Sequence, residues 1–119
     1  MTTTITAVGK DGTITFDGAL ITIERSGKTL LGPKGRGQQL ALAHVTAVDF
    51  NPGTRLAAGW IDFALPGSGP LGGTPAAAAR RATTSPTAVL FSHRKHLADF
   101  KALHDAITHA LAELRAGGA

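Results

Sequence analysis

The stretch HRKHLADFKALHDAITHALAEL, residues 93–114, has the apolar period of an amphipathic helix. At about 100° of rotation per residue, its large apolar side chains fall within one stripe, which is a little wider than 100°. The members of this stripe are Leu97, Phe100, Ile107, Leu111 and Leu114, with Leu103 at its margin. We therefore predict a C-terminal helix over residues 93–115 that buries this stripe against the rest of the chain.

The same stretch holds four of the five histidines, which allow two interpretations. His93 and His96 lie one turn apart and His104 falls inside the apolar stripe, so the three imidazoles suggest a metal site. About 12 Å of helix axis separates His96 from His104, however, and neither a cysteine nor a carboxylate on that face completes the ligand set. We therefore predict no metal site and no cofactor, and interpret His104 as a core residue and His109 as a solvated one.

The first 65 residues show the period of two that is typical of strands with one buried face. Ile14 and Phe16 share one face of such a strand, and Thr13 and Thr15 share the other. The two Asp-Gly pairs supply turns between strands. We predict strands at residues 4–8, 13–18, 20–25, 38–42, 45–50, 58–65 and 87–92.

A proline- and glycine-rich segment, residues 66–86, interrupts this pattern and predicts a mobile surface loop. Within it, Thr74 is followed by Pro75 and four alanines, which resembles an N-cap and the first turn of a helix. A helix this short is marginal in water when it stands alone.

The strand at residues 58–65 contains Trp60, which is the only tryptophan. Alternation places Ile61 and Phe63 on one face and Trp60 and Asp62 on the other, and the aspartate indicates that the second face is wet. Trp60 then either contacts a second copy or a partner protein, or lies beneath the 66–86 loop or beside Leu56. We select Trp60 and Asp62 as candidate partner-binding residues.

Composition limits the function classes. A length of 119 residues, with 43% hydrophobic and 17% charged residues, is typical of one globular domain spanning residues 1–119. The absence of cysteine excludes disulfides and thiolate chemistry. With no signal peptide and no apolar run long enough to cross a bilayer, we expect a cytoplasmic protein.

The net charge of +4 would suit an anionic ligand such as nucleic acid or lipid head groups, but an ordinary, mildly basic surface explains it at least as well. For an anionic ligand the candidate binding residues are Lys28, Lys34, Arg36, Arg80 and Arg81. We find no nucleophile elbow, phosphate-binding glycine loop or zinc-protease motif, so we predict no enzyme and no catalytic residues.

The order of several motifs resembles a known family. These motifs are GTITFDG and LITIER at the start, then LALAHVTAVDF and GWIDFAL, and finally VLFSHRKHLADFKAL. Together they resemble the bacterial PH-like domains, most closely the small actinobacterial DUF4429-type domains that are often found beside a SHOCT segment.

The resemblance implies an α+β, mainly β fold: a strongly bent antiparallel β-sandwich or barrel of about seven strands, capped by one C-terminal helix. It also implies a non-catalytic module that mediates protein–protein contacts or self-assembly, with itself or an unidentified protein as partner. The alternative is a module that binds anions, namely phosphorylated lipid head groups or nucleic acid, through a basic loop around KTLLGPKGR at residues 28–36.

Overall fold

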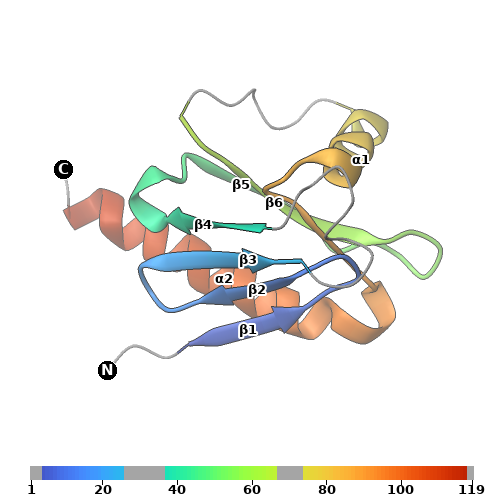
Figure 1. Ribbon diagram of the computed structural model, residues 1–119, viewed down its shortest axis with the longest axis horizontal. Helices are drawn as coiled ribbons and strands as arrows, with labels where there is room; N and C mark the ends of the chain where they lie inside the picture. The colour runs from blue at the N-terminus through green and yellow to red at the C-terminus, as the bar shows by residue number, and fades with distance from the viewer. Residues whose placement is uncertain (1–3, 26–36, 67–73, 118–119) are drawn as a thin grey trace.

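The computed structural model describes residues 4–25, 37–66 and 74–117 of the chain. These residues form two antiparallel sheets and two α-helices (Figure 1). One sheet has the order β1-β2-β3-β4, with strands β1 (Ile5–Val8), β2 (Thr13–Phe16), β3 (Leu20–Glu24) and β4 (Gly37–Ala41). The other has the order β5-β6-β7, with β5 (Ala47–Asn51), β6 (Gly59–Ala64) and β7 (Val89–Phe91). The helices are α1 (Pro75–Thr84) and α2 (His93–Gly117), and a 3₁₀ turn, η2 (Leu42–His44), joins the two sheets.

The predicted mainly β, α+β fold class is confirmed. The two sheets form a sandwich and not a closed barrel.

The turn between β2 and β3 shows how the sequence sets the register of the first sheet. The Asp17 carboxylate accepts hydrogen bonds from the backbone N–H groups of Leu20, at 2.7 Å, and Ala19, at 2.9 Å. These bonds hold the pKa of Asp17 below its usual value, because they favour the ionised carboxylate. The resulting register pairs Phe16 with Ile21 and keeps both side chains buried.

Helix α2 buries most of the predicted stripe. Phe100, Leu103, Ile107 and Leu111 are buried, and together with β1, β6 and β7 they close the main core. The prediction was wrong for Leu114, which remains 45% exposed because the helix extends past the sheets at that end.

The histidines of α2 make separate contacts. The ring of His104 stacks on Phe50 with the ring centroids 4.6 Å apart, and it also contacts the carboxylate of Asp105 at 3.1 Å. His109 is exposed and forms a 3.0 Å ion-pair contact with Glu113 on the next turn. Among the described residues, no group of three or more metal-ligating side chains lies close together.

The second face of β6 is buried, which corrects the prediction for Trp60 and Asp62. Alternation did place both residues opposite Ile61 and Phe63, but the exposed fractions of Trp60 and Asp62 are only 7% and 2%. Trp60 packs under α1 in a second cluster of buried side chains, whose other members are Ala78, Ala82 and Ala88. The expectation of a wet face was therefore wrong, and Trp60 lies beneath the 66–86 segment, as the second interpretation expected. The partner-binding role of Trp60 and Asp62 stays a prediction.

Helix α1 covers this face because the Thr74 segment folds as expected. The hydroxyl of Thr74 accepts the N–H of Ala77 at 3.1 Å, which caps the helix. Docking on Trp60 adds the tertiary contacts that a helix of this length needs. Residues 67–73 lie outside the described residues, and the mobility of the 66–86 segment stays a prediction.

The buried Asp62 carboxylate is satisfied by hydroxyl groups. One of its oxygens accepts hydrogen bonds from Thr87 at 2.6 Å and from Ser85 at 3.2 Å, and also from the N–H of Phe63 at 2.8 Å. The indole N–H of Trp60 donates to Asp49 at 3.0 Å. The Ser85 and Thr87 bonds fasten β6 to the connection between α1 and β7, and the Trp60 bond joins β6 to β5, so the polar residues on this face have a structural role.

The burial of Trp60 predicts its fluorescence. The emission of the native protein should lie at the blue end of the tryptophan range and should stay constant on dilution, because α1 and not a second copy covers the indole. The measurement is an emission spectrum across a dilution series, with apparent mass followed in parallel. A red shift that accompanies a fall in mass would contradict this placement.

Candidate functional site

Of the five basic residues selected as candidate anion-binding residues, two lie in the part of the chain that the structure describes. Lys28, Lys34 and Arg36 lie outside the described residues. Arg80 is exposed and Arg81 half-buried, and both belong to α1. That these five residues bind an anion together therefore stays a prediction.

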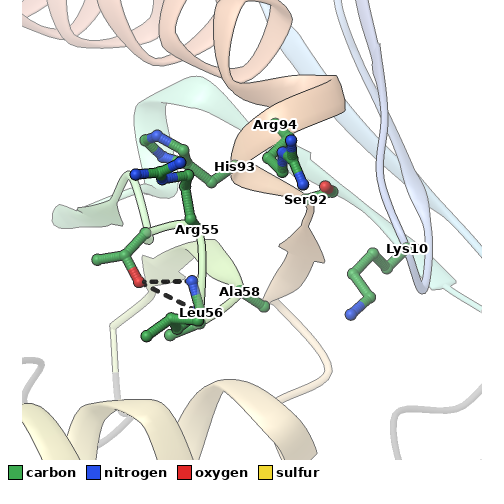
Figure 2. A pocket seen from close by; sticks show the side chains of 9 residues that line it. Lys10, Arg55, Leu56, Ala58, Ser92, His93 and Arg94 are labelled. Carbon is green, nitrogen blue, oxygen red and sulfur yellow. Dashed lines mark hydrogen bonds between the residues drawn. The ribbon is translucent and has the colours of Figure 1, made fainter.

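A different set of basic residues surrounds a pocket of about 170 Å³ at one end of the molecule (Figure 2). We call it the basic pocket. Its walls are Lys10 from the β1–β2 turn (residues 9–12), residues 54–58 of the β5–β6 loop (residues 52–58), and residues 92–94 at the start of α2. Lys10, Arg55, His93 and Arg94 thus meet from three separate parts of the chain.

The β5–β6 loop is folded by its own side chains. Asn51 accepts the N–H of Gly53 at 2.8 Å, and Gly53 adopts a φ of 74°, which favours glycine. The Thr54 hydroxyl accepts the N–H groups of Leu56 and Ala57, both at 3.1 Å, and the Thr54 N–H donates to the Ala57 carbonyl at 2.9 Å. Arg55 and Leu56 therefore occupy the two central positions of a tight, hydrogen-bonded turn.

The start of α2 is joined to this loop. Nδ1 of His93 lies 2.9 Å from the carbonyl oxygen of Pro52, to which it donates. The Ser92 N–H donates to Nδ1 of His96 at 3.1 Å, and the His96 N–H donates to the Ser92 carbonyl at 2.8 Å. The hydrogen bond of His93 fixes the distance between the loop and the helix, which form two of the three walls of the pocket.

The β1–β2 turn is anchored to β7. The N–H of Lys10 donates to the Leu90 carbonyl at 2.8 Å, and the N–H of Leu90 donates to the Asp11 carboxylate at 2.8 Å. Gly9 permits this approach, since a Cβ atom there would lie 2.6 Å from the Leu90 carbonyl oxygen and 2.8 Å from a methyl carbon of Val89. Backbone contacts therefore hold the base of the Lys10 side chain at the pocket.

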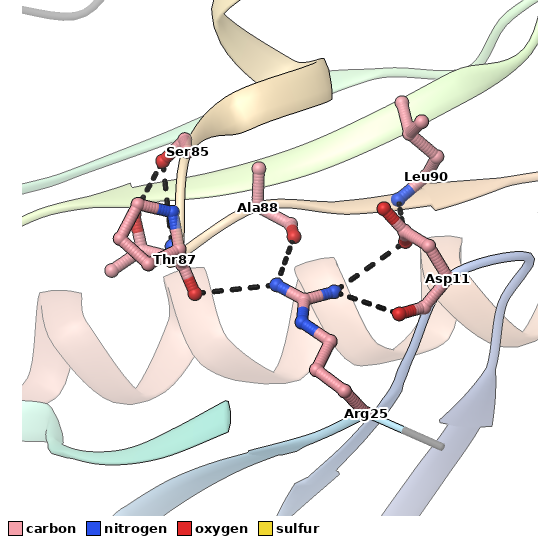
Figure 3. Close-up of polar contacts among 7 residues, drawn as sticks. Asp11, Arg25, Ser85, Thr87, Ala88 and Leu90 are labelled. Carbon is pink, nitrogen blue, oxygen red and sulfur yellow. Dashed lines mark hydrogen bonds and ion pairs between the residues drawn. The ribbon is translucent and has the colours of Figure 1, made fainter. Parts of the chain in front are cut away.

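A buried arginine supports the same turn (Figure 3). The side chain of Arg25 is fully buried and forms an ion pair with Asp11 at 3.5 Å. Its guanidinium donates to three carbonyl oxygens, those of Asp11 at 3.0 Å, Pro86 at 3.2 Å and Ala88 at 2.6 Å. Burial lowers the pKa of Arg25 from its ordinary value, and the charge of Asp11 partly opposes that shift. The positive charge of Arg25 is thus neutralised inside the protein.

The charges of the basic pocket are placed differently. Lys10, Arg55 and Arg94 are exposed, and none of them forms an ion pair with another residue of the described ranges. No aspartate or glutamate belongs to the described residues that line the pocket. Uncompensated cations around a concave site attract anions, and guanidinium groups match the oxygen geometry of phosphate and carboxylate groups.

The basic pocket was missed in the sequence because its members are far apart along the chain. Lys10 lies in an Asp-Gly turn, and Arg55 follows Asn51, Pro52 and Gly53, so both segments were recognised only as turns. Arg94 lies on the polar side of the helical stripe. The signal in the sequence is one basic residue at each of three connections between elements. It indicates a shared site only when the pairing of the strands is known.

Fold and pocket together define the class of this protein: a mainly β domain of two packed antiparallel sheets, with a C-terminal helix and a cationic pocket at one end. The chain belongs to the family described as Domain of unknown function (DUF4429), whose profile matches residues 14–108. This match confirms the DUF4429 part of the resemblance. The curated proteins and the solved structures yielded no match to the chain. Neither helix of the described ranges combines the length and the apolar character that crossing a membrane requires.

Proposed function

We propose that this protein is a non-catalytic binding module that holds a small anionic group, of the phosphate ester class, in the basic pocket. The observation that carries the proposal is the convergence of Lys10, Arg55, His93 and Arg94 on one cavity whose described lining holds no acidic residue. A volume of about 170 Å³ accommodates one phosphate group with its first contacts. The PH-like relationship is part of this proposal, and the order of seven strands followed by a long helix supports it.

The chemistry of the lining residues favours binding over catalysis. Ser92 and His93 are adjacent, but activation of a serine requires a hydrogen bond from its hydroxyl to the base, and the described residues show none between the Ser92 hydroxyl and the His93 ring. In this pocket Nδ1 of His93 donates to a backbone carbonyl, that of Pro52. Apart from the hydroxyl of Thr54, the other polar side chains of the lining are the cations of Lys10, Arg55 and Arg94, which suit recognition of an anion.

A phosphate titration followed by backbone amide NMR tests the proposal. Inorganic phosphate should shift the amide signals of Lys10, Arg55 and residues 92–94, and raising the salt concentration should weaken the effect. The double variant Arg55→Gln, Arg94→Gln should bind roughly tenfold more weakly, since two charge-assisted contacts are lost. Both side chains are exposed, so its melting temperature should match that of the parent.

Arg80→Gln provides the matched control, because Arg80 is an exposed arginine on α1, outside the basic pocket. Its phosphate affinity should equal that of the parent. If the shifts instead cluster at residues 28–36 and at Arg80 and Arg81, the anion site is the one expected from the sequence, and the basic pocket is wrong.

A second candidate function is self-assembly or contact with a partner protein, which a different observation favours. Strand β4 is an edge strand, and a hollow of about 410 Å³ beside it is lined in part by Gln39, Leu40 and Leu65. An edge strand beside a hollow is a surface that partner chains use. Light scattering tests this candidate with Gln39→Lys, because a lysine on an edge strand discourages strand pairing and should lower the mass of any multimer that β4 forms.

A further inference from the structure

Leu56 is the most exposed large apolar residue in the part of the chain that the structure describes, at 99%. It also borders the basic pocket, so an exposed apolar side chain lies directly beside a cationic cavity (Figure 2). Single exposed leucines are common on proteins and need no special explanation. What distinguishes Leu56 is its setting beside Arg55 at the tip of a turn that is already folded.

The turn presents Leu56 at no further ordering cost. Four hydrogen bonds that Thr54 donates or accepts close the turn, and His93 joins the loop to α2 through the Pro52 carbonyl. Because the turn is already ordered, it loses little backbone entropy when it binds another surface. The same turn directs one cation and one apolar side chain outward at adjacent positions.

We infer that this end of the molecule docks on the surface of an anionic membrane, with Leu56 entering the lipid interface while Lys10, Arg55 and Arg94 contact lipid phosphates. The inference rests on the proposed function, because it assigns the anionic group in the pocket to a lipid head group. It adds that the bound phosphate belongs to a lipid, and it gives a role to Leu56, which carries no charge.

Shape and charge favour a bilayer over an acidic protein. A fully exposed side chain on a loop tip is convex, so a protein partner would need an apolar hole of matching shape surrounded by carboxylates. An anionic bilayer offers an apolar layer beneath a continuous sheet of phosphates and imposes no such match. Three exposed cations at one end of the molecule also act within one Debye length of such a surface.

Flotation with lipid vesicles tests the inference on the full chain. The parent should bind vesicles made of equal amounts of phosphatidylcholine and phosphatidylserine and should not bind vesicles of phosphatidylcholine alone. Leu56→Ser should weaken binding to the mixed vesicles roughly tenfold, because the apolar contact is lost.

Leu114→Ser is the matched control. Leu114 is an exposed leucine near the other end of α2, about 30 Å of helix axis from Arg94. Its substitution should leave vesicle binding at the level of the parent. A loss of binding in Leu114→Ser equal to that in Leu56→Ser would overturn the assignment of the docking end.

Insertion can be observed directly because the chain has no cysteine. Leu56→Cys labelled with an environment-sensitive dye should shift its emission to the blue when mixed vesicles are added, and Leu114→Cys labelled in the same way should not.

The outcomes separate this inference from the proposed function. Suppose that phosphate shifts the pocket amides, but the parent does not bind mixed vesicles or Leu56→Ser binds them like the parent. The membrane inference is then overturned and the proposed function stands. An acidic protein partner would be the next occupant to test. If phosphate fails to shift the pocket amides, the proposed function is overturned, whatever the vesicles show.

Discussion

Phe100→Ala should lower the free energy of unfolding by about 3–5 kcal/mol, which approaches the whole stability of a small domain. The Phe100 ring is fully buried and stacks on Phe91 with the ring centroids 4.4 Å apart. A Cβ atom at Gly9 would lie 3.0 Å from the edge of this ring, so the first hairpin is packed on it as well. The substitution therefore opens a cavity where α2, β7 and the first hairpin meet. Urea unfolding followed by circular dichroism measures the loss.

His109→Ala is the control for this substitution. His109 lies on the same helix but on its exposed side, with only a surface contact to Glu113. Its removal should change the unfolding free energy by less than about 0.5 kcal/mol. Equal midpoints for Phe100→Ala and the parent would show that α2 does not pack on the sheets as described.

Periodicity was sufficient to predict the elements that bury one face. The stripe on α2 and the alternation in β2 and β3 are local patterns, and each determines which side chains must leave water. The error at Leu114 has a simple cause, because the pattern cannot show where the helix extends past the sheets that it covers. Local patterns thus predicted which residues share a face, but not how far the covering element reaches.

The error at Trp60 and Asp62 has a different origin. Alternation grouped the two residues correctly, but whether their face is wet depends on α1. A ten-residue helix is stable only when it is docked, so its presence is a tertiary property that propensity does not reveal. The aspartate was misleading because two hydroxyls, those of Ser85 and Thr87, satisfy it from more than twenty positions away along the chain.

The basic pocket depends on tertiary structure to a still greater degree. Lys10, Arg55 and Arg94 become neighbours only because β7 pairs with β6 and also accepts a backbone hydrogen bond from the β1–β2 turn. Each of the three segments resembles an ordinary turn or helix start when it is considered alone. Their shared position follows from strand pairing, which a single sequence does not specify for distant segments.

Arg25→Met should also cost about 3–5 kcal/mol, although methionine fills a similar volume. The substitution removes the hydrogen bonds that the guanidinium donates to the carbonyl oxygens of Asp11, Pro86 and Ala88. It also removes the ion pair with the Asp11 carboxylate. Breaking a buried ion pair by removing one partner costs about 3–5 kcal/mol, and the lost hydrogen bonds are part of that cost. Arg115→Met, which removes an exposed arginine that donates to the Thr46 carbonyl, should change the unfolding free energy by less than about 1 kcal/mol.

A double-mutant cycle then isolates the charge interaction from the lost carbonyl bonds. Asp11→Asn keeps an oxygen that can accept the N–H of Leu90 and removes the negative charge. In the Arg25→Met background this second change should cost less than it does in the parent, because only in the parent does it leave Arg25 buried without a countercharge. The coupling free energy should therefore exceed about 1 kcal/mol. Additive effects would mean that the arginine acts only through its carbonyl bonds. Since this network anchors the turn that carries Lys10, Arg25→Met should also weaken phosphate binding at the basic pocket under conditions where the variant remains folded.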